Sequence, residues 1–323
     1  MSTPPRLFLV YRSDKMNRTN GALFRELGEH FAVTGFDCRN GLPASARELQ
    51  GLASCDVCVW WVKFARLMAL PAFDWGGWSG LRVLYDWDAA QNYWRWGRHD
   101  LRGQWMAAFR KHCFDLLICT STPTAMRFQE DGVAAEVLLK GYAGDAFHQL
   151  GVQRNGLGSF GAPYPPREYA RHRLHRAGLA VTHFKCEFQE LNHQLNCFEA
   201  MLICNMPGSW VVNGKVPFGI RTRLGLRNLD RAPDLLGKTF EAAAAGAVPL
   251  VDEAADLQVA GFADQQNCLT YTSFEELIQK WRSVKDQHEV LKTIGDSASM
   301  LARSRHTWRH RVMELEMILR RHL

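Results

Sequence analysis

The chain has 323 residues, of which 47% are hydrophobic and 22% are charged, and these proportions exclude a disordered, collagen-like or coiled-coil protein. At about 100–200 residues per domain, the length indicates two domains or one large one. The formal net charge of +6 favours an anionic partner, which could be a nucleotide sugar, a nucleic acid or an anionic lipid.

Strands and helices alternate through the first half of the sequence. Short apolar runs predict buried strands at residues 7–11, 57–62, 82–85, 115–121 and 135–141. Apolar residues at helical spacing predict helices at residues 22–31, 103–114 and 123–132. Because helices join the strands of a parallel sheet, this alternation predicts a parallel sheet covered on both faces.

A stretch rich in glycine and proline, residues 143–166, interrupts the alternation and predicts a domain boundary near residue 150. The alternation then resumes, with strands predicted at residues 180–184, at 201–206 and just after Gly246. The helices predicted in this half occupy residues 167–179, 188–200, 235–246, 273–284 and 306–323. The sequence therefore predicts an α/β protein with two doubly wound, Rossmann-like domains, and a ligand site in the cleft between them.

The sequence predicts neither a membrane span nor a signal peptide. No apolar run approaches the ~18 residues that a span requires, and the apolar stretch at residues 7–11 is too short for a leader. Cys58, Cys119 and Cys204 lie inside strand-like apolar runs, which is typical of free thiols packed in the core of a protein from a reducing compartment. We therefore expect a cytoplasmic protein.

Three glycines, Gly156, Gly158 and Gly161, have the spacing of a dinucleotide-binding loop. Such a loop must open a helix at once, whereas prolines intervene here, so we expect a glycine-rich strand that opens the second domain. In that strand Gly158 would let the backbone approach a ligand. Arg167 falls at the start of the next predicted helix, where a guanidinium and backbone N–H groups suit a phosphate, unless the side chain is simply solvated.

The most informative segment is residues 219–246. Its loop is crowded with the arginines 221, 223, 227 and 231, and the helix that follows carries Lys238 and Glu241. A helix N-terminus beside cations suits a diphosphate. Glu241 can accept two hydrogen bonds from a ribose diol, or it can simply stabilise the helix start. Asp234 precedes Glu241 by seven residues, about two helical turns, so both can face one ligand.

The sequences "KTFEAAAAGAVPLVDEAADL" and "GFADQQNCLTYTSFEELIQKW" resemble the donor-binding half of GT-B glycosyltransferases of the spore-coat-type, family 1-like group. The resemblance implies that residues 1–150 form the acceptor-side domain, that residues 151–304 bind the nucleotide sugar, and that a helix at 305–323 crosses back. It also implies that Glu241 holds the ribose, while Lys238, Arg167 and Arg227 neutralise the leaving diphosphate. Because fixed cations and helix dipoles can stabilise that charge, we expect no metal and no permanently bound cofactor.

The sequence departs from this group at one position. Many retaining members have two glutamates with seven residues between them, and the first touches the donor sugar. Pro233 stands at the first of these positions here, with Asp234 beside it. The proline cannot make the sugar contact that the glutamate makes in those members, and the departure also weakens the argument for a retained anomeric configuration.

A second cluster follows a predicted strand of the first half. Asp86 and Asp88 stand at its end, where either can orient or deprotonate an acceptor hydroxyl, or cap a turn. Asp88 matches a cleft loop of the resembled group and is the favoured residue. Beyond it, aromatic and basic side chains alternate and suit a sugar or a nucleic acid, although a packed loop would have the same composition. They are Trp94, Arg95, Trp96 and Arg98.

We therefore expect a glycosyltransferase that moves a hexose from a nucleotide diphosphate sugar, most simply a UDP-sugar such as UDP-glucose, to an acceptor hydroxyl with retention. Asp88, Asp86 and Lys238 are the expected catalytic residues. The acceptor stays open between a glycan, a lipid, a protein and a hydroxymethylated DNA base. The alternative is a catalytically silent module of the same fold that binds a glycan or nucleic acid.

Overall fold

The computed structural model describes residues 3–16, 19–62, 64–89, 102–162, 165–205 and 234–323. The chain forms two compact units. The first comprises residues 1–139 together with 308–323, and the second comprises residues 140–307. The division therefore precedes the glycine-rich stretch, because residues 140–150 are bonded to the second unit. In particular, Tyr142 N donates to the His306 carbonyl at 3.1 Å, and Leu150 N donates to Asn196 Oδ1 at 2.9 Å.

The first unit is a six-stranded sheet with strand order β2-β1-β3-β4-β5-β6, and all of its paired strands are parallel. Its strands are β1 (Leu7–Tyr11), β2 (Val33–Asp37), β3 (Val57–Trp60), β4 (Leu81–Asp86), β5 (Leu116–Cys119) and β6 (Ala135–Val137). Its α-helices are α1 (Thr19–His30), α2 (Phe64–Met68), α4 (Arg102–Lys111), α5 (Thr122–Glu130) and α12 (Trp308–His322). The direction in which the chain adds strands reverses between β1 and β3.

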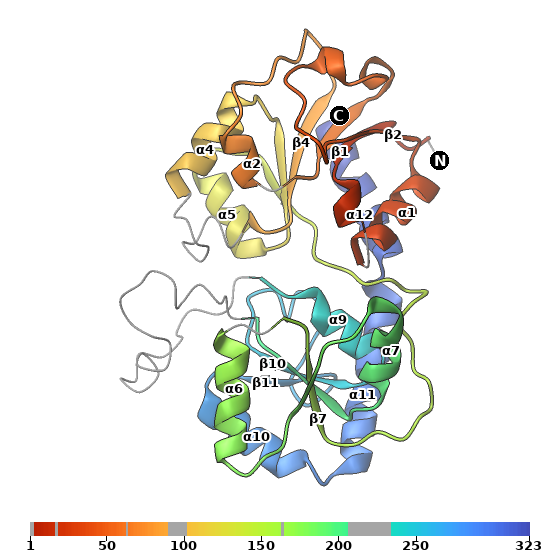
Figure 1. Cartoon of the computed structure of the whole chain (residues 1–323), viewed down its shortest axis with the longest axis vertical. Coiled ribbons are helices and arrows are strands. Elements are labelled where there is room, and N and C mark those ends of the chain that lie inside the picture. Colours follow the sequence, from red (N-terminus) through yellow and green to blue (C-terminus); the bar gives the residue numbers. More distant parts are fainter. Residues whose placement is uncertain (1–2, 17–18, 63, 90–101, 163–164, 206–233) are drawn as a thin grey trace. The chain divides into compact units, whose positions relative to one another are not determined.

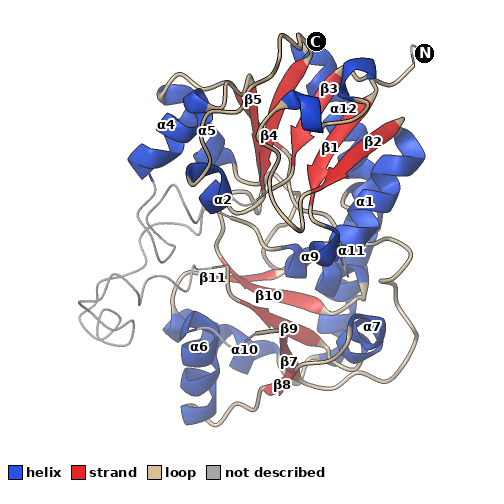
Figure 2. Cartoon of the chain, turned by 45° about the horizontal axis from the view of Figure 1, so that its top comes forward, coloured by secondary structure: helices blue, strands red, loops and turns tan. Residues whose placement is uncertain are grey.

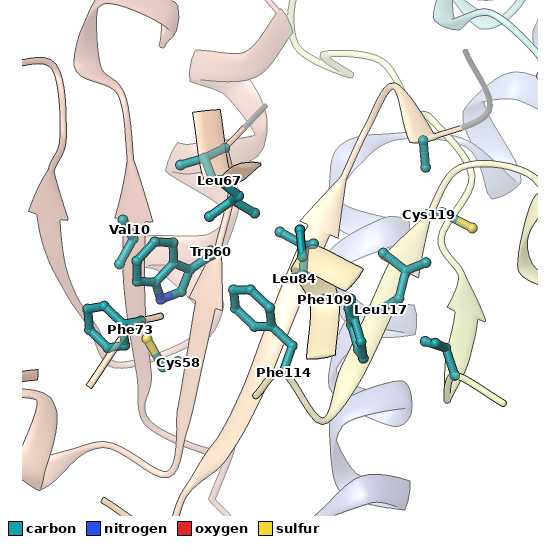
Figure 3. Close-up of a cluster of buried hydrophobic side chains, with 14 of the residues drawn as sticks. Val10, Cys58, Trp60, Leu67, Phe73, Leu84, Phe109, Phe114, Leu117 and Cys119 are labelled. Atoms are coloured by element: carbon teal, nitrogen blue, oxygen red, sulfur yellow. The ribbon is translucent and has the colours of Figure 1, made fainter. Parts of the chain in front are cut away.

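Side chains on one face of this sheet form a continuous core. Phe8, Val10, Cys58, Trp60 and Leu84 share that face because the strands are in parallel register, and they pack with residues of α2, α4 and α5 (Figure 3). The helices α1 and α12 contact each other and lie beside the sheet on the side away from α2, α4 and α5 (Figure 1). Both faces are therefore covered, as the near-continuous apolar strands require.

The second unit is a five-stranded parallel sheet with strand order β11-β10-β9-β7-β8 (Figure 2). Its strands are β7 (Leu157–Phe160), β8 (Thr182–Phe184), β9 (Ala200–Ile203), β10 (Val248–Asp252) and β11 (Leu269–Tyr271). Its helices are α6 (Pro165–Arg176), α7 (Phe188–Asn196), α9 (Gly237–Ala244), α10 (Phe274–Val284) and α11 (His288–Arg305). Here the order reverses between β7 and β9.

Glycine lets two helices of the second unit approach closely. Gly246 ends α9 with a left-handed backbone (φ 79°), as the sequence predicted. A Cβ on Gly295 of α11 would lie 2.4 Å from the Gly246 carbonyl oxygen, so only glycine fits there. The C-terminal end of α9 is thereby held against α11.

The nine cysteines are all free thiols. Cys58, Cys119 and Cys204 are fully buried in strands or directly after one, which confirms the predicted core packing. No helix within the described ranges is long and apolar enough to cross a membrane.

Candidate functional site

Two cations meet where β7 of the second unit ends, at the point where the strand order reverses. Ligands of open α/β sheets bind at such reversal points, outside the carboxyl ends of the strands. The backbone turns sharply at Gly161 (φ 91°). A Cβ there would lie 2.1 Å from Lys238 Nζ and 3.6 Å from Arg167 Nη1. Glycine is therefore required, and both charged groups lie against the same turn.

Lys238 belongs to the first turn of α9. Its ammonium donates to the Phe160 carbonyl at 2.7 Å and lies 4.5 Å from the centre of the Phe160 ring. Burial, and then the charge of the nearby Arg167 guanidinium, lower the pKa of Lys238 to about 7, while Glu241 opposes the shift. Burying the two positive charges at this turn is therefore unfavourable, and an anion bound there would offset that electrostatic free energy.

Arg167 lies on the first turn of α6 and is only 2% exposed. Its Nη1 donates to the Ala162 carbonyl at 2.6 Å. The two predicted donor-site cations are thus brought together from helices that are about seventy residues apart in the sequence. Glu241 follows Lys238 by three residues, one turn along α9, and is 7% exposed.

The start of α9 is held by a residue that the sequence analysis missed. Asn205, directly after β9, accepts a hydrogen bond from the Leu236 N–H at 3.0 Å. Asp252, at the end of β10, in turn accepts from the Asn205 N–H at 2.5 Å. All three groups lie at the carboxyl edge of the sheet, so Asn205 anchors the helix that carries Lys238 and Glu241. Its position at the end of a predicted strand is the signal that could have identified it.

Asp234 was predicted to face the same ligand as Glu241, but in the structure it forms an ion pair with Lys140. Lys140 Nζ lies 2.5 Å from Asp234 Oδ2, and each side chain is 7% exposed. The structure therefore places Asp234 in a buried ion pair with the segment that opens the second unit.

Gly158 lies within β7, where a Cβ would come within 2.7 Å of Phe198 and Met201. Glycine is required at this position by packing between side chains. The close approach between backbone and a charged group occurs at Gly161 instead.

In the first unit, Asp86 ends β4 and is 2% exposed. Its carboxylate accepts from the Asp88 N–H at 3.0 Å and from Trp105 Nε1 at 3.3 Å. Asp88 is half-buried and lines a small cavity together with Asp86. The two carboxylates predicted to meet an acceptor are therefore adjacent.

Several predicted residues lie outside the described ranges. They are Trp94, Arg95, Trp96 and Arg98 of the acceptor cluster, and Arg227 and Pro233 of the donor segment. For the residues that the structure does describe, no group of three or more histidine, cysteine or acidic side chains is arranged to hold a metal.

The family comparison concerns the second unit and α12. Residues 215–317 match the model of a family described as glycosyl transferase-like. No curated protein matches the sequence.

Solved structures share the fold over nearly the whole chain. Sucrose-phosphate synthase from Thermosynechococcus elongatus superimposes with a TM-score of 0.66 at 7% identity, covering 98% of each chain. HepE from Anabaena, solved with UDP and glucose, gives 0.61 at 12% identity, covering 98% of this chain and 99% of that one. AviGT4, a glycosyltransferase of avilamycin A biosynthesis, gives 0.53 at 13% identity, covering 98% of each. At these identities the likeness establishes the fold, which is the predicted GT-B architecture of two Rossmann-like domains.

Proposed function

We propose that the chain transfers a hexose from a UDP-sugar to an acceptor hydroxyl, since residues 215–317 match a glycosyl transferase-like family model and the chain has the GT-B fold. The observation that carries the proposal is the pair of cations, Lys238 and Arg167, at the Gly161 turn. HepE, which has the same fold, was solved with UDP-glucose bound. The donor diphosphate would occupy this turn.

The two cations would act on the negative charge of the leaving group. As the bond between the sugar and the diphosphate breaks, negative charge grows on the leaving UDP. The ammonium of Lys238 and the guanidinium of Arg167 are already in place, so they stabilise that charge without reorganising. Glu241 accepts hydrogen bonds from the ribose hydroxyls and orients the nucleotide.

We propose a retaining outcome, in which the departing phosphate takes the proton of the acceptor hydroxyl on the same face of the sugar. Asp88 then orients the acceptor. In an inverting enzyme, Asp88 or Asp86 would instead act as the base. The anomeric configuration of the first product, read by NMR before it equilibrates, decides between these two routes.

Two fixed cations replace the divalent metal that many phosphate-leaving reactions use, so we expect turnover to continue in EDTA at an unchanged rate. The measurement compares initial rates in EDTA with rates in added Mg²⁺ or Mn²⁺. A rate that collapses in EDTA and returns with metal would contradict the assignment of this role to Lys238 and Arg167.

Thermal melting with UDP, GDP, ADP and dTDP and their sugar conjugates tests the donor site. A ligand at one hundred times its dissociation constant adds ~2.7 kcal/mol to stability, so a selective shift with the UDP family is expected. Lys238→Met should abolish that shift. The absence of a shift with every nucleotide, in the presence as well as the absence of candidate acceptors, would overturn the proposal.

A catalytically silent binding module is the second candidate. It is favoured by the proline at position 233 and by the Lys140 partner that occupies the neighbouring Asp234. Glu241→Gln separates the two functions. In an enzyme it lowers UDP-sugar affinity and turnover together, whereas in a silent module it leaves binding of the glycan or nucleic acid unchanged.

A further inference from the structure

A cavity of about 150 Å³ opens in the first unit, at the carboxyl ends of β1, β3 and β4. Arg12 follows β1, Trp61 follows β3, and Asp86, Trp87 and Asp88 end or follow β4. The strand order of this sheet reverses between β1 and β3, so the cavity stands where open α/β sheets bind ligands. The lining residues that the structure describes all belong to the first unit.

Aromatic rings form one wall of the cavity. The rings of Trp61 and Trp87 are stacked with centroids 5.5 Å apart and an interplanar angle of 28°. Trp87 also stacks on Trp308 at 5.6 Å and 27°, so α12 supports the wall from behind. Trp61 and Trp87 are only half-buried. Because Trp87 stacks on both Trp61 and Trp308, Trp61 is the ring offered to the cavity, and its electron-rich face suits the C–H bonds of a pyranose ring, which carry partial positive charge.

Two arginines reach the same cavity and differ in their partners. Arg12 is committed to Asp14 through two hydrogen bonds of 2.8 and 2.5 Å. Arg66 of α2 has no ion pair or hydrogen bond with any residue that the structure describes. Both guanidinium groups oppose the rise in the pKa of the Cys38 thiol that burial causes.

The cavity thus joins an aromatic wall, two carboxylates and the Arg66 guanidinium, which pairs with none of the described side chains. Carboxylates accept hydrogen bonds from hydroxyls but repel phosphates, so Asp86 and Asp88 disfavour a polyphosphate chain such as nucleic acid. A lone guanidinium favours one carboxylate or phosphate with bidentate geometry. The small volume suits one sugar ring.

We propose that this cavity binds the acceptor as a saccharide that carries an anionic group, with its ring on Trp61, its hydroxyls on Asp86 and Asp88, and its anion on Arg66. The role as acceptor rests on the proposed transferase function, whereas the binding itself does not. The anion is a carboxylate, as in a uronic acid, or a phosphate, as in a sugar phosphate.

Titration by ligand-observed NMR tests the site on the full chain. The probes are methyl α-glucopyranoside, methyl α-glucuronide and glucose 1-phosphate, which differ in charge and in the source of the anion. We expect at least one anionic probe to bind about tenfold more tightly than the neutral glycoside, as a charged hydrogen bond of ordinary strength allows. The anionic probe that binds more tightly than the neutral glycoside shows whether the acceptor's anion is a carboxylate or a phosphate.

Arg66→Met should reduce the affinity of the anionic probe to that of the neutral one, and Arg66→Lys should restore part of the difference. Arg47→Met is the matched control, because Arg47 is exposed in the same unit and does not line the cavity. Equal affinity for charged and neutral probes, no binding of any probe, or the same behaviour in Arg66→Met and Arg47→Met would overturn the proposal.

The melting shift with UDP keeps the two proposals distinguishable. A normal UDP shift without anion preference in the NMR titration removes the acceptor-class proposal and leaves the transferase in place. Anion-selective binding without any UDP shift leaves the cavity as a saccharide site and removes the transferase function.

Discussion

Lys238 is held at the Gly161 turn with its pKa lowered to about 7, mainly by burial and then by the Arg167 guanidinium. In the unfolded chain the same amine keeps its proton to about pH 10.5. Below pH 7 both states are protonated and the buried charge destabilises the fold. As the pH rises from 7 to 10.5, the folded state loses that proton first, and the destabilisation disappears.

This protonation predicts a pH dependence of donor binding. UDP-glucose stabilises the charged ammonium, so above pH 7 binding must take up a proton. We expect its dissociation constant to be flat below pH 7 and to rise by up to about tenfold per pH unit above it. Calorimetric titrations between pH 6 and 9, in buffers of different ionisation enthalpy, measure both the affinity and the proton uptake.

Lys238→Arg is the control, because a guanidinium stays charged over this range and should give a flat profile. A wild-type profile that is also flat, with no proton uptake, would contradict the position of Lys238 at the diphosphate.

Elements that depend on apolar runs could be predicted from the sequence, and those that depend on tertiary contacts could not. The strand β2 escaped prediction because its sequence, VTGFD, lies at the sheet edge with no fully buried residue and lacks an apolar run. The helix α11 escaped because small or polar residues, including Gly295 and Ser299, form part of its buried face. Small residues are needed there because α11 lies against α9.

Within the candidate site, too, features set by local sequence could be predicted and features set by tertiary contacts could not. The placement of Lys238, Arg167 and Glu241 near helix starts could be predicted from residue type and position. The position of Asn205 near a strand end was readable, but its bonding partner was not, because the bond to Leu236 spans 31 residues and exists only once β9 and α9 are folded together. The partner of Asp234 lies 94 residues away, at Lys140, and no local pattern indicates it.

The close contact between α9 and α11 predicts that adding one methyl group at Gly295 lowers the stability of the fold. Gly295→Ala places a Cβ 2.4 Å from the Gly246 carbonyl oxygen, so the helices must separate. We expect a loss of about 1–3 kcal/mol in the free energy of unfolding, measured by urea denaturation. Gly28→Ala is the matched control, since Gly28 is an exposed position of α1 with no atom within 4 Å of the new Cβ. It should gain about 0.5–1 kcal/mol.

The buried pair between Lys140 and Asp234 predicts a defect in stability. Removing either charge takes away the ion-pair partner of a buried group, so Lys140→Met or Asp234→Leu should each cost about 3–5 kcal/mol. The double variant should recover much of that loss, because it removes both members of the buried ion pair. Denaturation of the three variants measures the cost, and UDP titration measures donor affinity.

A strong loss of UDP-sugar affinity in Asp234→Asn, at a temperature where the variant is fully folded, would show instead that this carboxylate contacts the donor. That outcome would restore the role that its spacing from Glu241 suggested.

At the scale of the whole molecule, the chain forms two units with separate cores, and the first is completed only when α12 returns to it. Leu319 of α12 is fully buried in the first unit. Leu319→Ala should therefore lower the stability of that unit by about 2–5 kcal/mol. The second unit keeps its own sheet and the Lys238 site, so its stabilisation by UDP should be unchanged.

Calorimetric melting with and without UDP tests this independence. In the variant, we expect an early transition that UDP does not move and a later one that UDP raises as in the wild type. Leu291→Ala provides the reciprocal case, because Leu291 is buried in the core of the second unit. There the transition that responds to UDP should be the one that falls. If Leu319→Ala instead lowers a single transition and weakens the UDP response with it, the two units unfold as one, and the donor site depends on the first.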